Sequence, residues 1–126
     1  MFYRIICVDF DGVIHSYTTK WTNATTIADP PVPGAFAWLE GLLATMDQEP
    51  CLRPVVYSSR SKEPGAVTAM QAWFKQHGFN EQLLAKLEFP TQKPSAFWAL
   101  DDRCDRFEGT FPSAAELADK KPWNKR

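Results

Sequence analysis

The chain has 126 residues, of which 44% are hydrophobic and 23% are charged, and its formal net charge is −1. This length predicts a single domain over residues 1–126, and the hydrophobic share is large enough to form a packed core, which excludes a disordered chain. Fourteen basic against fifteen acidic residues exclude a strong overall attraction to nucleic acid or to an anionic membrane.

The cysteines and the apolar runs indicate where the protein works. Cys7, Cys51 and Cys104 are widely spaced and odd in number, which disfavours a disulfide scaffold and a structural zinc site. Asp9 and Asp11 interrupt the first apolar run, which disfavours a signal peptide, and no run approaches the ~20 apolar residues that span a bilayer. We therefore expect a cytoplasmic protein that does not associate with membranes.

The first half of the chain predicts one strand, one irregular flap and one helix. A run that is apolar on both faces predicts a buried strand over residues 3–8. The flap follows at about 13–31, where polar residues, glycine and proline replace any regular pattern. A helix is predicted next, because apolar residues recur at helical spacing up to Met46. Pro33 and Gly34 mark its start, since proline suits the first turn of a helix.

The second half predicts further strands alternating with helices. Residues 53–57 carry a β-branched pair typical of a strand, and a helix is predicted between Pro64 and Gly78. The remaining predicted elements are strands at 87–89 and 97–100, a short helix capped by Ser113 and a basic tail at about 119–126. This order of elements is typical of an α/β fold with a mostly parallel central sheet.

Polar residues gather where the predicted strands end. In open parallel sheets, ligands bind outside the carboxyl ends of the strands. The polar residues at these ends are Asp9, Asp11, Ser58, Ser59, Arg60, Asp101 and Asp102, with Lys93 in the loop after the third strand. Four carboxylates at one edge repel each other unless a cation neutralises them, and oxygen ligands alone favour Mg²⁺. Ser58 and Lys93 are residue types that hold phosphate oxygens, so the set indicates phosphoryl chemistry at a metal-assisted aspartate.

The order of these residues resembles the four motifs of the haloacid dehalogenase (HAD) superfamily. The motifs are the acidic run from Asp9 to Val13 after a buried strand, then Ser58, then Lys93, then the pair Asp101-Asp102. The resemblance extends from residue 4 to about residue 111 and includes small HAD-like proteins of bacteria and phages. It implies a Rossmann-like HAD fold flanked by helices, with a small flap and no cap domain.

The resemblance also implies a Mg²⁺-dependent phosphohydrolase that acts on a phosphomonoester. Asp9 is then the nucleophile that forms an aspartyl phosphate, and Asp11 is the general acid and base. Ser58 and Lys93 bind the transferring phosphate, with Ser59 and Arg60 beside them. The implied metal ligands are Asp9, Asp11 through its backbone carbonyl, Asp101 and Asp102.

The length leaves no space for a separate cap, which predicts an open cleft for a bulky, possibly nucleotide-like phosphorylated substrate, or one completed by a neighbouring subunit. The alternatives are a nucleotide or nucleic-acid-end phosphatase or phosphotransferase and a non-catalytic phospho-accepting module similar to signalling receivers. Receivers have a lone acceptor Asp in the middle of the chain, and this sequence has none.

Three local questions stay open in the sequence. Only seven residues separate Lys93 from Asp101, too few for a crossover helix, so either the return is unusual or a late strand is misplaced. Trp21 either anchors the flap or stacks on a base or sugar. Arg60 either binds substrate phosphate or pairs with a surface carboxylate, while His15 and the basic tail are expected to be solvated.

Overall fold

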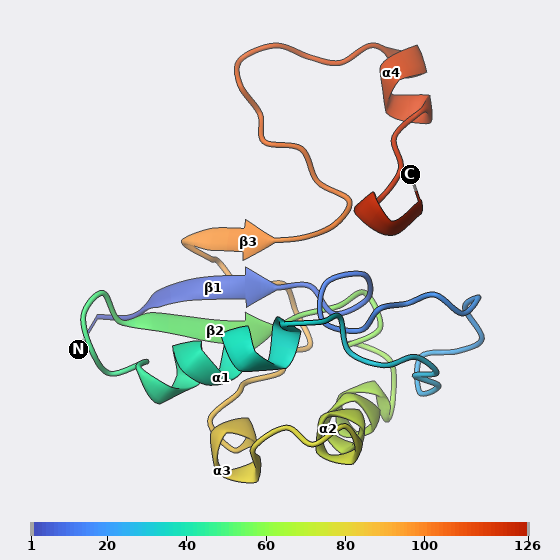
Figure 1. The fold of residues 1–126 in the computed structure, drawn as a ribbon. Coiled ribbons are helices and arrows are strands. Elements are labelled where there is room, and N and C mark those ends of the chain that lie inside the picture. The colour runs from blue at the N-terminus through green and yellow to red at the C-terminus, as the bar shows by residue number, and fades with distance from the viewer. Residues whose placement is uncertain (1, 126) are drawn as a thin grey trace.

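A parallel three-stranded sheet forms the centre of the computed structural model, which describes residues 2–125 (Figure 1). Its strands are β1 (Arg4–Val8), β2 (Leu52–Val56) and β3 (Trp98–Leu100), in the order β2-β1-β3. Both outer strands pair with β1 in parallel, so all three carboxyl ends meet at one edge. The predicted α/β class with a parallel sheet is confirmed.

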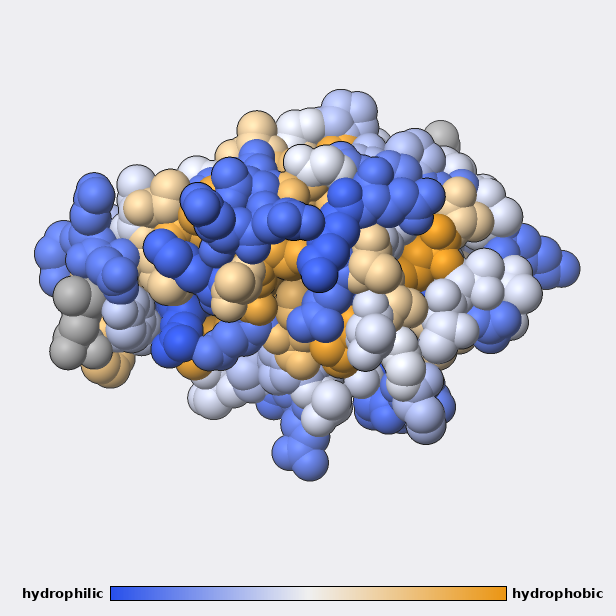
Figure 2. Space-filling model, turned by 90° about the horizontal axis from the view of Figure 1, so that it is seen from below, coloured by the Kyte–Doolittle hydropathy of each residue, from blue (hydrophilic) through white to orange (hydrophobic). Residues whose placement is uncertain are grey.

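Two helices cover one face of the sheet. They are α1 (Ala35–Ala44) and α2 (Ala66–Gln76), and each follows a glycine with a left-handed φ, Gly34 and Gly65. Their apolar sides form a core with Val8 and Val56, which are register partners and therefore present the same face. In Figure 1 these helices lie below β2, and Figure 2 views this side, where hydrophilic side chains are interspersed with apolar ones.

The segment between α2 and β3 differs from the expectation. A short helix that the sequence analysis missed, α3 (Glu81–Leu84), is capped by the Asn80 side chain, which accepts a hydrogen bond from Leu83 N. The strand predicted at 87–89 is wrong in extent, because it is reduced to one parallel bridge between Glu88 and Val55. Pro90 follows directly and has no N–H to extend a ladder.

Residues 89–97 return to the sheet without a helix and lead into β3. Two contacts explain how so short a connection reaches a parallel strand. Phe97 N donates to Ile5 O of β1, and β3 then pairs with β1. The sheet face that carries Cys7 and Ala99 borders a cavity that Lys93 also borders. The return is therefore unusual, and the last predicted strand is in its place.

The flap is closed at its base by backbone hydrogen bonds. Ser16 N donates to Pro30 O, and Val32 N donates to Ile14 O. This pairing brings the ends of the 13–31 flap together, directly after β1, so that the flap stands next to the carboxyl edge of the sheet.

The C-terminal segment returns to the flap. The predicted capping box is confirmed at α4 (Ala114–Ala118), and a 3₁₀ turn, η1 (Trp123–Lys125), follows it. The Trp123 indole donates to Gly12 O at 2.7 Å, and the Asn124 amide donates to Ser16 O at 3.0 Å. The tail is anchored at these two residues, because their side chains donate to backbone carbonyls of the flap base, while Lys120, Lys121 and Lys125 are exposed, as expected for a basic tail. Residue 126 lies outside the described part.

In the described part of the chain, no helix is both long enough and apolar enough to cross a bilayer.

Candidate functional site

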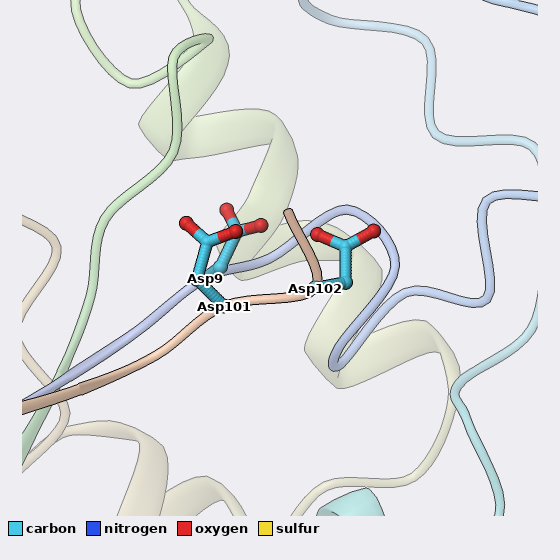
Figure 3. Close-up of side chains that lie close together, drawn as sticks. All are labelled: Asp9, Asp101 and Asp102. Carbon is cyan, nitrogen blue, oxygen red and sulfur yellow. The ribbon is translucent and has the colours of Figure 1, made fainter. Parts of the chain in front are cut away.

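Three carboxylates converge at the carboxyl ends of β1 and β3. Asp9 follows β1, and Asp101 and Asp102 follow β3, its direct neighbour in the sheet. Figure 3 shows the three side chains pointing to the same side, and one oxygen of each lies within 4.8 Å of the others. The parallel pairing of adjacent strands therefore brings together residues that are more than ninety positions apart in the sequence.

The electrostatics of this acidic triad (Asp9, Asp101 and Asp102) are unfavourable when it stands alone. Burial, the neighbouring charge of Asp101 and a hydrogen bond with Asp102 raise the pKa of Asp9 to about 8. Among the ion pairs of the described residues, none involves the triad. Asp102 Oδ1 is buried and has no hydrogen-bond partner within residues 2–125. A hard divalent cation fits this all-oxygen donor set, because it balances the charge and coordinates the orphaned oxygen.

Gly12 provides the space in which Asp102 lies. Its φ is +87°, and a Cβ added there would lie 2.2 Å from Asp102 Oδ2 and 2.7 Å from Asp102 Cγ. A side chain at this position is excluded both by the backbone conformation and by the close approach of the carboxylate. Glycine is therefore required for the flap base and the end of β3 to meet.

Asp11 belongs to a different network on the flap side. The Arg60 guanidinium donates from Nε to Asp11 Oδ2 at 3.0 Å and from a terminal nitrogen to Oδ1 at 2.9 Å. His15 Nδ1 also contacts Asp11 Oδ1, at 2.8 Å. The carboxylate of Asp11 is thus bound by the side chains of both Arg60 and His15.

Arg60 is almost fully enclosed, with 1% of its surface exposed. It also donates to the backbone carbonyls of Ala24 and Thr26, and its guanidinium lies 4.7 Å from the centre of the Trp21 ring. Of the two alternatives for Arg60, the structure therefore shows an ion pair, and its partner is Asp11 rather than a surface carboxylate. Trp21 anchors the flap through this contact and is still 47% exposed.

His15 is buried, so the expectation of a solvated loop histidine is wrong. Its Nε2 accepts the backbone N–H of Asp29 at 3.1 Å, which requires the neutral ring to carry its proton on Nδ1 and to donate it to Asp11. Asp29 is held in turn by Thr19, and its carbonyl accepts the Trp73 indole N–H. The i, i+4 spacing of Asp11 and His15 was the only signal for this contact in the sequence.

Two cavities of about 330 Å³ each flank Asp9. Both are bordered by Asp9, Ser58, Ser59 and Arg103. The first is also bordered by Lys93 and by residues of β1 and β3. Ser58 is buried, and its hydroxyl oxygen accepts the backbone N–H of Arg60 at 3.3 Å, which fixes it at the end of β2.

The second cavity lies under the flap. It is bordered by Asp11, Tyr17, Trp21 and Asp102 in addition to the shared residues. Tyr17 was missed in the sequence analysis, and no pattern there marks its left-handed backbone, with φ of 56°.

No protein-family model, no curated protein and no solved structure matches this chain.

The structure brings nearly all of the residues predicted from the sequence to one edge. Asp9, Asp101 and Asp102 form one cluster, and Ser58, Ser59 and Lys93 border the cavity beside it. The carboxylate of Asp11 and the side chain of Arg60 stand apart in their own ion pair. Such an arrangement can hold a cation and an anionic group together, with the Asp9 carboxylate between two cavities.

Proposed function

We propose that this protein is a Mg²⁺-dependent phosphohydrolase that acts on a phosphomonoester through an aspartyl phosphate. The observation that carries the proposal is the acidic triad beside a cavity with a lysine and a buried serine. A HAD-type Rossmann-like fold without a cap domain, working in the cytoplasm, is part of the proposal. The order of Asp9, Ser58, Lys93 and Asp101-Asp102 along the chain supports it.

The residues that would hold the metal are Asp9, Asp101 and Asp102, together with the backbone carbonyl of Asp11. When bound, Mg²⁺ supplies charge neutralisation for both the phosphate and the attacking carboxylate. Asp102 Oδ1, buried and unpartnered within the described residues, supports a ligand at this place. The pKa of Asp9, raised to about 8, also supports a cation at this place. A nucleophilic carboxylate must be ionised at neutral pH, and a nearby positive charge favours the ionised form.

The covalent steps use this chain's own residues. A carboxylate oxygen of Asp9 attacks phosphorus, and the bond from phosphorus to the ester oxygen breaks as the ester oxygen takes a proton from Asp11. Asp11 then removes a proton from water, whose oxygen attacks phosphorus and breaks its bond to Asp9. Inorganic phosphate leaves with both aspartates restored, while Ser58 and Lys93 hold the remaining phosphate oxygens.

Proton transfer from Asp11 requires a movement. Both of its oxygens accept hydrogen bonds from Arg60, so neither can carry the transferred proton in this position. The proposal therefore includes a turn of the Asp11 side chain from Arg60 toward the ester oxygen. Its starting place on the border of the second cavity, next to Asp9, makes this a local rotation.

The test is hydrolysis of an aryl phosphate by the full chain with and without Mg²⁺. We expect turnover only with Mg²⁺, and a loss of at least about a thousandfold in kcat for Asp9→Asn. Asp119→Asn, an exposed residue at the end of α4, is the matched control and should keep the wild-type rate. Wild-type turnover by Asp9→Asn would contradict the mechanism, and stable labelling by acetyl phosphate without turnover would instead indicate a phospho-accepting module.

A further inference from the structure

The two cavities that flank Asp9 are chemically different. Lys93 borders only the first cavity, and Asp11 borders only the second. This inference rests on the proposed function, because it uses the roles of these two residues. The residue that neutralises phosphate charge must face the phosphoryl oxygens, whereas the general acid must face the ester oxygen. The phosphoryl group is therefore oriented toward the first cavity, and the leaving group extends into the second.

The second cavity has an aromatic wall formed by Tyr17 and Trp21. The Trp21 ring packs against the buried Arg60 guanidinium, and the residue is still 47% exposed. Tyr17 is held with φ of 56°, a conformation that is costly for a bulky side chain. Such strain persists where the surrounding structure enforces it, and here it places an aromatic residue on the cavity border.

We propose that the second cavity binds a planar aromatic leaving group, which stacks against Trp21 and Tyr17 while Asp11 protonates its ester oxygen. The cavity volume of about 330 Å³ is in the range of small-molecule sites. Aromatic side chains stack on any planar ring, so a nucleobase and a simple aryl group share this chemistry. The flap thus selects the substrate, and the acidic triad performs the reaction.

The experiment measures kcat/KM with Mg²⁺ for three esters: a nucleoside 5′-monophosphate, phenyl phosphate and butyl phosphate, which has no ring. For at least one of the two ring-bearing esters, Trp21→Leu should lower kcat/KM about tenfold more than it does for butyl phosphate. Trp21→Phe should restore most of this difference, since phenylalanine also stacks. Trp38→Leu, at an exposed tryptophan of α1, is the matched control and should leave the ratio between esters unchanged.

Three results decide the matter. A larger Trp21 effect on the nucleoside ester assigns the ring to a nucleobase, and a larger effect on phenyl phosphate assigns it to an aryl group. An equal effect of Trp21→Leu on all three esters overturns the inference while leaving the proposed hydrolase intact.

A binding measurement separates this inference from the proposed function. Calorimetry with the Asp9→Asn chain compares the nucleoside monophosphate with butyl phosphate and needs no turnover. We expect the ring-bearing ligand to bind about tenfold more tightly, and this advantage to disappear with Trp21→Leu. If the wild type hydrolyses nothing but this advantage is found, the function fails and the aromatic site stands. Equal affinities for the two ligands overturn the aromatic site.

Discussion

Two groups of carboxylates lie at the same edge of the sheet, and they differ in how their charge is balanced. Asp11 is bound by Arg60 and by His15, at distances of 2.8–3.0 Å. The acidic triad has no such partner among the described ion pairs, and burial and mutual repulsion raise the pKa of Asp9 to about 8. The charge of the first group is thus balanced within the protein, whereas the second group is one that could hold a metal ion.

The largest expected loss of stability comes from breaking the ion pair between Asp11 and Arg60. Arg60→Met leaves the Asp11 carboxylate and two backbone carbonyls without their donor, which should lower the free energy of unfolding by about 3 kcal/mol. Arg53→Met is the matched control, because it removes an exposed ion pair with Glu88 and should cost less than about 1 kcal/mol. Urea unfolding measures both, and equal losses would contradict the distinction between the two ion pairs.

A smaller loss of stability is expected from a substitution at Gly12, which follows Asp11 in the chain and lies close to Asp102 of the triad. Gly12→Ala forces a Cβ against Asp102 at a left-handed φ, which should cost about 2 kcal/mol of stability and displace Asp102 from the triad. Gly41→Ala is the control, because nothing lies within 4 Å of a Cβ there and alanine favours the interior of α1, with an expected gain of about 0.5–1 kcal/mol. Thermal unfolding with and without Mg²⁺ tests this further: only Gly12→Ala should lose the stabilisation by Mg²⁺.

The smallest effect is expected from removing one charge of the triad, and it is measured in the pH dependence of stability. An aspartate ordinarily ionises near pH ~4, whereas Asp9 in the folded chain does so at about 8, so between these values the folded state holds the extra proton. In the absence of divalent cations, the free energy of unfolding contributed by Asp9 therefore falls as pH rises from about 4 to about 8.

Differential scanning fluorimetry of the chelator-treated protein measures this fall. Replacing one neighbouring charge with Asp101→Asn should reduce it and raise the melting temperature at pH ~8 by about 5 °C relative to the wild type. Mg²⁺ should do the same for the wild type. Identical pH profiles for the wild type and Asp101→Asn would show that repulsion within the triad is not the cause.

The sequence predicted the parallel sheet and the convergence of the acidic triad, because both follow from strand patterns and from residues at strand ends. Two features could not be predicted, and both depend on tertiary contacts. His15 is buried by its contacts with Asp11 and Asp29, and Trp123 reaches Gly12 across 111 positions of the chain. The strand at 87–89 is reduced to one bridge by the adjacent Pro90, a local signal that was present in the sequence.

The most direct test of the central claim is to trap the phosphoryl group on the enzyme during turnover. The full chain is mixed with an aryl phosphate and Mg²⁺, quenched with acid within milliseconds and mapped by peptide mass spectrometry. The account predicts a phosphoryl group on Asp9 that requires Mg²⁺ and is absent from Asp9→Asn. Rapid release of phosphate with no phosphoryl group on Asp9 at any time would contradict it.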